Sequence, residues 1–263
     1  MNAEQAVLKE FLSCPLQDGQ ELLRRFASLP GAVFRQGAHP LERFVYVPGA
    51  RTDRVLLIAH CDTVWDQNYR RVDASQALCE ENGVLHGTVD GLGIGADDRA
   101  GCAMLWLLRD SGHSLLILDG EEHGHFGANY LCREHKKLLR ELNAHRYLLQ
   151  LDLWGGRSCL YHGIPNSRRF REMIEGMGFV EEKKNNGTDI SYLAKAACGA
   201  NLSVGYHRFH RADEFLSVAE WEGVLATLRT ALAKPQKRYR TRCTVRLRRF
   251  TRRAASRIYH HFR

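Results

Sequence analysis

The sequence predicts a three-layer α/β fold, in which a mostly parallel mixed sheet carries helices on both faces. Three short apolar runs have the length and composition of strands buried on both faces, namely VLLIA at 55–59, LLIL at 115–118 and YLLQL at 147–151. Segments with helical spacing of apolar residues lie among them. Strands that alternate with helices are typical of parallel sheets, because a parallel connection needs a long crossover.

The N-terminal elements follow from their local patterns. Apolar residues recur at helical spacing through residues 1–28, and LPG at 29–31 ends this helical segment. Residues 44–47 alternate as in a strand, and residues 76–88 are typical of a hairpin around Glu81-Asn82-Gly83.

Four more elements complete the expected body of the chain. Residues 100–108 predict an apolar helix and residues 166–177 an amphipathic one. A short strand is expected at 202–206 and a closing helix at 219–232, after which Lys234-Pro235 marks a boundary.

Composition excludes several classes of protein. The chain has 263 residues, of which 44% are hydrophobic and 26% charged, so it is neither mainly disordered nor collagen-like nor a coiled coil. No apolar run approaches the roughly 20 residues of a membrane helix, and the first residues do not resemble a secretory signal. Eight cysteines without CxxC spacing then favour a cytoplasmic protein with reduced thiols.

The net charge of +8 is unevenly distributed. Residues 234–263 hold ten Arg, two Lys and no acidic residue; removing these 12 from the 38 basic residues leaves 26 against 30 acidic ones, a balance of −4. We therefore expect an acidic domain over 1–233, with 1–30 as its N-terminal helical segment, and a basic tail over 234–263.

The tail carries one apolar stripe at helical spacing, formed by Leu247, Phe250, Ala254, Ile258 and Phe262. A basic helix of this kind is suited to nucleic acid or to an anionic membrane surface. A solvated extension without a partner is the alternative, and the sequence leaves both interpretations open.

Acidic and histidine residues follow each buried strand. Since open α/β sheets bind ligands beyond the carboxyl ends of their strands, these side chains should meet at one edge. A further pair lies in a glycine-rich loop before a helix. The groups are His60 and Asp62, Asp119 to Glu122, Asp152, His207 and His210, and Asp97-Asp98.

Histidine combined with Asp and Glu is a ligand set suited to zinc or a similar divalent metal. One catalytic zinc takes about three protein ligands. The larger set fits two metals that share one carboxylate, and an additional acid beside a ligand fits a general base.

Five motifs together resemble the co-catalytic di-zinc exopeptidases, a family that includes leucyl aminopeptidases, peptidase T and acetylornithine deacetylase. The resemblance runs from Phe44 to Leu232. It is carried by AHCDTV, GADDRAG, DGEEHGHFGA, GTDI and NLSVGYHRFHRADEFLS, together with the Asp after YLLQL.

The resemblance implies which residues would bind each of the two metals. His60 and Asp152 would hold one zinc ion, Glu122 and His210 the other, and Asp97 would bridge both. The metals would be two Zn²⁺ ions, or another divalent metal such as Co²⁺ or Mn²⁺.

The resemblance also implies roles beside the metals. Glu121 would be the general base, and Asp62 would orient His60. A cis peptide is expected at Asp97–Asp98. Only 34 residues, 153–186, separate Asp152 from the GTD motif, so no lid or dimerisation domain is expected there and the oligomeric state is left open.

The implied function is hydrolysis of peptide bonds by an aminopeptidase, with a peptide or small amide as substrate. Deacylation of an N-acyl amino acid is the alternative among enzymes. A protein on the same fold that binds nucleic acid or membrane without catalysis is the alternative from another class.

Two neighbouring residues, Asp98 and His207, compete for these roles. Asp98 could replace Asp97, and one of the two should turn outward or pair with Arg99. The HxxDEF pattern favours His210 over His207.

Four further residues near the motifs have ordinary structural explanations. Cys61 is expected in the core, His123 and His125 as residues that begin a helix, and Asp189 as a helix N-cap.

Overall fold

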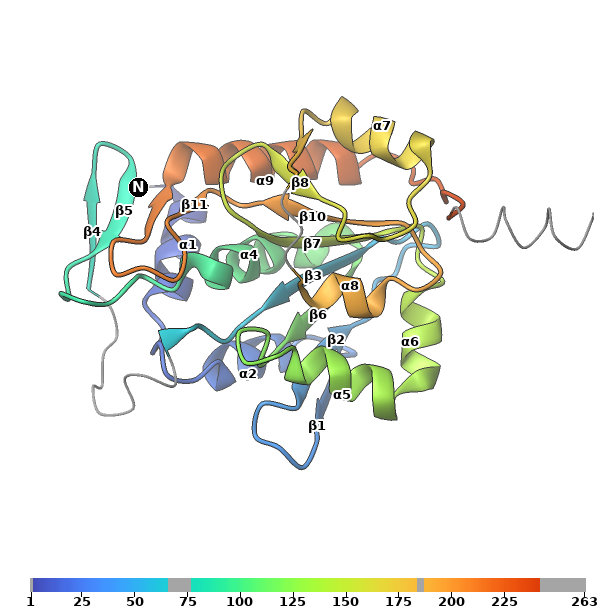
Figure 1. Ribbon diagram of the computed structural model, residues 1–263, viewed down its shortest axis with the longest axis horizontal. Coiled ribbons are helices and arrows are strands. Elements are labelled where there is room, and N and C mark those ends of the chain that lie inside the picture. The colour runs from blue at the N-terminus through green and yellow to red at the C-terminus, as the bar shows by residue number, and fades with distance from the viewer. Residues whose placement is uncertain (1, 66–76, 184–186, 242–263) are drawn as a thin grey trace, which may run out of the picture.

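A computed structural model describes residues 2–65, 77–183 and 187–241 of the protein. Its centre is an eight-stranded mixed sheet of order β1-β2-β6-β3-β7-β10-β8-β9 (Figure 1). The strands β6, β3, β7 and β10 are mutually parallel, which confirms the predicted α/β class. Their bounds are β1 (Val33–Gln36), β2 (Arg43–Val47), β3 (Leu56–His60), β6 (Ser114–Leu118), β7 (Leu148–Leu153), β8 (Ser158–Leu160), β9 (Val180–Glu181) and β10 (Gly199–Ser203).

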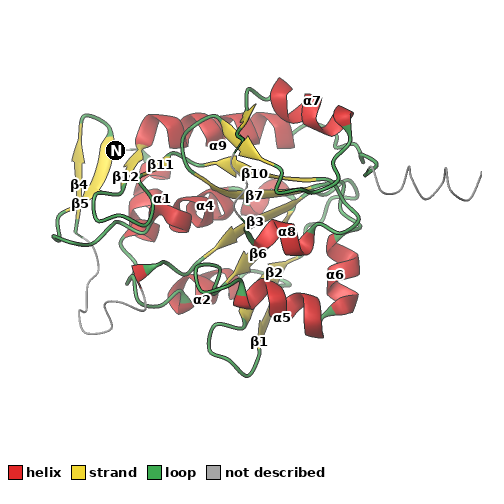
Figure 2. Ribbon diagram, in the orientation of Figure 1, coloured by secondary structure: helices red, strands yellow, loops and turns green. Residues whose placement is uncertain are grey.

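Helices cover both faces of this sheet (Figure 2). Alternate residues of β3 face opposite cores: Leu57 lies in the core under the first group of helices, and Ile58 in the core under the second. The first group comprises α1 (Ala3–Leu12), α2 (Gln20–Ala27), α4 (Ala96–Leu107), α7 (Arg168–Gly176) and α9 (Val218–Leu232). The second comprises α5 (Phe126–Glu134), α6 (Lys136–Leu142) and α8 (Asp189–Leu193).

A second, antiparallel sheet has the order β11-β12-β5-β4, with β4 (Leu78–Glu81), β5 (Val84–Gly87), β11 (Tyr206–His207) and β12 (Phe215–Ser217). The predicted hairpin is confirmed: Asn82 and Gly83 form its turn, with φ of 51° and 77°. The strand expected at 202–206 is split instead. At Gly205, where φ is 92°, the chain leaves β10 for β11, and a Cβ there would lie 2.8 Å from the Trp221 nitrogen.

The N-terminal helical segment is two helices rather than one. The chain breaks between α1 and α2 around Pro15, which has no N–H to donate to a helix. The buried guanidinium of Arg99 donates hydrogen bonds to the carbonyls of Cys14 and Pro15 at this break. The sequence pattern of apolar residues gave no sign of this long-range contact.

The first residues of the expected tail pack against the domain. The Gln236 backbone N–H donates to Asp53 at 2.7 Å, and Arg238 donates to backbone carbonyls between α6 and β7. The Tyr239 ring lies against Tyr147 and Phe170, with centroids 6.0 Å and 5.5 Å away. The packed chain therefore extends past the expected boundary at Ala233 to Thr241. The apolar stripe predicted from Leu247 onward lies outside the described residues.

Truncation at two points should show how much residues 234–241 contribute to the stability of the domain. A chain ending at Ala233 loses the Tyr239 packing and the Gln236 contact, so we expect its free energy of unfolding to fall by about 3–5 kcal/mol. A chain ending at Thr241 keeps both and should unfold like the full chain. Urea denaturation measures the difference, and Tyr239→Ala in the full chain is the matched control. Equal midpoints for the two truncated chains would show that residues 234–241 contribute nothing to stability.

Within the described ranges, no helix has both the length and the apolar composition needed to cross a membrane.

Candidate metal centre

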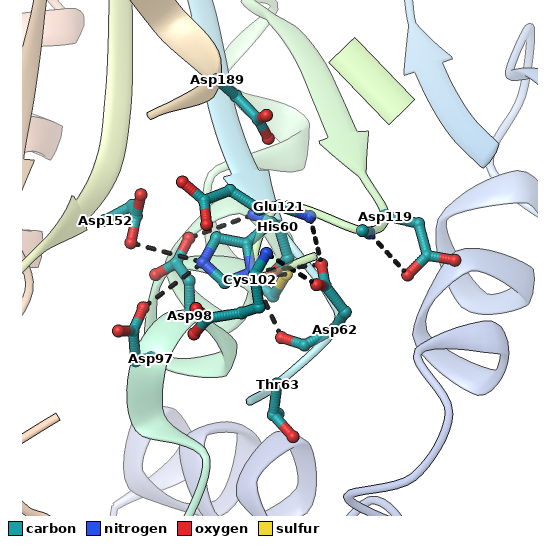
Figure 3. Close-up of polar contacts among 12 residues, drawn as sticks. His60, Asp62, Thr63, Asp97, Asp98, Cys102, Asp119, Glu121, Asp152 and Asp189 are labelled. Atoms are coloured by element: carbon teal, nitrogen blue, oxygen red, sulfur yellow. Dashed lines mark hydrogen bonds and ion pairs between the residues drawn. The ribbon is translucent and has the colours of Figure 1, made fainter. Parts of the chain in front are cut away.

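His60 ends β3 and is fully buried at the carboxyl edge of the sheet (Figure 3). Its Nε2 lies 3.3 Å from Asp97 Oδ1 and 3.5 Å from Asp152 Oδ1. Burial alone would lower the pKa of the imidazole, but the neighbouring carboxylates, with Asp152 first, raise it well above its usual value. The imidazole therefore stands at the centre of an acidic cluster.

Asp97 connects two groups of side chains. Its Oδ1 faces His60, while its Oδ2 lies 3.3 Å from Nε2 of His210. It sits at the start of α4, after Gly95 with φ of 62°, and the Asp97–Asp98 peptide is cis, as the motif resemblance implied. Burial opposes the shift, but contacts with His210 and His60 lower the pKa of Asp97.

Gly101 allows α4 to lie this close to the sheet. A Cβ at Gly101 would come 2.0 Å from the Leu151 carbonyl oxygen on β7 and 2.3 Å from Asp98 Oδ1. Any side chain there would push the helix, and with it Asp97, away from β7.

The second group lies between the loop after β6 and the loop after β11. His210 Nε2 is 2.8 Å from Glu122 Oε1. Burial, followed by the charge of Asp97, raises the pKa of Glu122 to about 7. Burial would lower the pKa of His210, but its contacts with Asp97 and Glu122 raise it to about 10.

Asp152 lies in β7 and completes the first group. Its Oδ2 accepts hydrogen bonds from Gln150 Nε2 at 2.8 Å and from Thr188 Oγ1 at 2.9 Å. Its Oδ1 is thereby directed toward His60. Burial raises the pKa of Asp152 to about 6.

Asp62 holds three parts of the cluster together. Its Oδ1 lies 3.4 Å from His60 Nδ1 and accepts the Glu121 backbone N–H at 3.1 Å, while its Oδ2 accepts the Glu122 backbone N–H at 3.0 Å. A carboxylate at this place fixes both the ring of His60 and the path of the two glutamates.

Glu121 lines a pocket that it shares with Asp97, Glu122, Asp152 and His210. Burial raises the pKa of its carboxyl well above the usual value, with the charge of Asp152 acting in the same direction. Glu121 belongs to neither of the two potential metal-binding groups at this edge of the sheet, His60-Asp97-Asp152 and Asp97-Glu122-His210.

The side chains fit two divalent cations. Among the described residues, His60 Nε2 is buried without a hydrogen-bond partner, and it faces two carboxylates. The two groups, His60-Asp97-Asp152 and Asp97-Glu122-His210, share Asp97. Buried carboxylates at this density require a compensating charge, and nitrogen with oxygen ligands suits zinc.

One nearby candidate, Asp98, is placed differently from expectation, whereas His207 lies outside the cluster as the HxxDEF pattern predicts. Asp98 neither turns outward nor pairs with Arg99: its carboxylate is buried and accepts the backbone N–H groups of His60 and Gly101 at 3.2 Å and 3.1 Å. His207 lies outside the cluster, with its Nε2 2.6 Å from Glu220. Cys61 is buried in the core, as predicted.

Asp189 is not a helix N-cap. Thr188 occupies that position in α8, and its hydroxyl donates to Asp152 instead. Asp189 is the first residue of the helix, and its carboxylate is directed toward Glu121 in Figure 3.

Aromatic side chains form a wall of the pocket that sequence reasoning missed. Trp154 and Phe209 are stacked, with centroids 5.4 Å apart and planes inclined by 16°. Tyr206 also lines the pocket and donates to Asp152 at 3.3 Å. The position of Phe209 beside His210 was the available signal.

Metal binding should release protons and weaken as pH falls. The neighbouring carboxylates raise the pKa values of His60 and His210, so both imidazoles hold protons more tightly in the metal-free chain than a free imidazole does. A metal takes the unprotonated nitrogen, so protons compete with it at low pH. Between about pH 8 and pH 6 we expect affinity to fall by up to tenfold per unit for each proton displaced.

Calorimetric zinc titrations in two buffers of different ionisation enthalpy measure this proton release. A binding heat that is the same in both buffers would contradict the expectation.

Comparison with known proteins shows which solved structures share this fold. No protein-family model and no curated protein sequence matches the chain. Solved structures do match. Aminopeptidase PepT from Bacillus cereus superposes with a TM-score of 0.61 at 15% identity, over 88% of this chain and 97% of that one.

Two further structures agree. A tripeptidase from Staphylococcus aureus gives a TM-score of 0.61 at 12% identity, over 89% of this chain and 98% of that one. The TET1 peptidase of Pyrococcus horikoshii gives 0.60 at 15% identity, over 88% and 99% of the two chains. The chain therefore shares the fold of these peptidase structures, in agreement with the resemblance seen in its motifs.

Proposed function

We propose that this protein is a di-zinc exopeptidase that removes N-terminal residues from peptides. The observation that carries the proposal is the pair of potential metal-binding groups that share Asp97, with Glu121 beside them in one pocket. In a structural metal site, protein ligands fill every coordination position. Such a site would not need a carboxylate like that of Glu121, which lies in the pocket but belongs to neither ligand group. The peptidase names of the structural neighbours support the same reaction class.

His60, Asp97 and Asp152 would hold one ion, and Asp97, Glu122 and His210 the other. Two divalent ions in such a site would polarise the scissile carbonyl and lower the pKa of a water molecule.

Glu121 is the residue that moves the proton. Its carboxylate lines the pocket beside both groups, so it can accept a proton from the attacking water. The same carboxyl group then returns the proton to the leaving amine. Asp62 fixes the position of Glu121 relative to the metal ligands, because it accepts the Glu121 backbone N–H.

The pocket wall supports binding of an apolar side chain. Trp154 and Phe209 offer stacked aromatic surface next to His210. Apolar contact of this kind fixes a substrate residue while leaving the polar cluster free for the reacting amide.

Digestion of a defined peptide library by the zinc-loaded protein tests the proposal. We expect mass spectrometry to show peptides shortened from the N-terminus, and no shortening after chelation or in Glu121→Gln. Shortening from the C-terminus would refute the aminopeptidase assignment. Cleavage of N-acyl amino acids with intact peptides would replace it by deacylation, and no cleavage of any amide with Zn²⁺, Co²⁺ or Mn²⁺ would refute hydrolysis altogether.

A further inference from the structure

We propose that His125, anchored by Asp189, is a positioning residue that holds the Glu121 carboxylate in place; the inference rests on the proposed role of Glu121. His125 Nδ1 lies 3.4 Å from Glu121 Oε1 and 3.3 Å from Asp189 Oδ1. One ring nitrogen therefore stands between two carboxylates that come from different parts of the chain.

Asp189 has no other evident reason to carry a charge at this place. It is fully buried, and neither of its oxygens has a regular hydrogen bond within the described part of the chain. Burial raises the pKa of Asp189, and His125 opposes that rise. A buried carboxylate without a partner would cost several kcal/mol, so contact with His125 accounts for its presence.

The backbone of His125 is also unusual. It adopts φ of 60° at the N-cap of α5, a conformation that costs a non-glycine residue about 1–2 kcal/mol. Its side chain makes no capping hydrogen bond to the helix. A glycine would fit the turn with less strain, so a histidine at this strained position points to a role for the ring.

The neighbouring ring of Tyr192 limits where this imidazole can go. The two ring centroids are 4.8 Å apart, and Tyr192 belongs to the same helix, α8, as Asp189. The helix that carries the anchoring carboxylate therefore also packs against the ring.

The charges determine which atom carries the proton. A lone pair on Nδ1 would face two carboxylate oxygens and be repelled by both. We therefore place a hydrogen on Nδ1, which faces the Glu121 and Asp189 oxygens at 3.4 Å and 3.3 Å without regular hydrogen-bond geometry. Glu121 is then held at its backbone by Asp62 and at its carboxylate by His125, and it keeps a fixed orientation toward the pocket.

Steady-state kinetics of the zinc-loaded protein test the role. His125→Gly relieves the backbone strain but removes the donor, so we expect kcat to fall by about 10- to 100-fold, as displacement of a reacting group does. KM and zinc content should stay unchanged. His125→Asn places an amide nitrogen near the Nδ1 position and tolerates the same backbone, so it should restore most of the lost kcat.

Two controls separate positioning from a structural effect. Asn82→Gly relieves the same backbone conformation in the hairpin turn and should leave kcat unchanged. Asp189→Asn should lower kcat, and the His125→Gly/Asp189→Asn double variant should lose no more than His125→Gly alone, because both act through one contact. Wild-type kcat in His125→Gly, or additive losses in the double variant, would overturn the proposal.

A measurement without catalysis keeps this inference distinct from the proposed function. In ¹⁵N-histidine NMR of the zinc-loaded protein, His125 should carry hydrogen on Nδ1, and that resonance should shift in both Asp189→Asn and Glu121→Gln. An Nδ1 without hydrogen, or a resonance insensitive to either variant, would overturn the inference. If these shifts appear in a protein that cleaves no amide, the hydrolase proposal fails and the contact stands.

Discussion

Glu121→Gln should lose turnover while keeping both metals. The amide cannot take a proton from the attacking water, so we expect kcat to fall by about 10²- to 10⁴-fold, the usual contribution of a general base. KM should change little, because the shape of the pocket is kept. The backbone N–H of residue 121 still reaches Asp62, so the path of the chain to Glu122 is preserved.

Rate measurements paired with zinc analysis distinguish this role from a ligand role. Glu122→Ala is the matched control on the adjacent residue: it should lose one zinc equivalent, since Glu122 belongs to the group of His210. Loss of metal in Glu121→Gln, or turnover close to that of the wild type, would show that the roles of the two glutamates are wrongly assigned.

Asp97→Ala should weaken both metal sites at once. Asp97 is the one residue common to the two groups, and its oxygens face His60 and His210 separately. We expect both zinc equivalents to bind at least tenfold more weakly, in line with the loss of a shared charged ligand.

Asp152→Ala is the comparison for this prediction, because Asp152 belongs to the group of His60 and not to the group of His210. Competition with a chromophoric chelator gives the two zinc affinities. An Asp97→Ala protein that retains one tight site would show that Asp97 does not bridge.

The sequence by itself determined the residues that meet at the edge of the sheet. Buried strands are continuous apolar runs, and in a parallel sheet their carboxyl ends lie together. His60, Glu122 and Asp152 could therefore be placed in one cluster from their positions after VLLIA, LLIL and YLLQL. The assignment of Asp97 came from the resemblance of its motif, since nothing in local periodicity separates it from Asp98.

The tertiary structure decided the contacts that join distant segments. The sequence could not predict that Asp189 lies near Glu121. The two carboxylates are linked through His125, and the pattern GTDI is equally typical of a helix start. The same holds for Arg99, which reaches the carbonyls around Pro15, and for Tyr239, which packs on Tyr147.

The physical reason is that some features depend on residues adjacent in the sequence, whereas others depend on residues far apart in it. Burial and periodicity are properties of consecutive residues, so they predict strands, helices and the edge to which a strand delivers its last side chain. The partner of a buried charge depends on which elements pack together and on the direction of each side chain. Glu121, His125 and Asp189 are therefore recognisable as a unit only after the loop following β6 and helix α8 have been brought side by side.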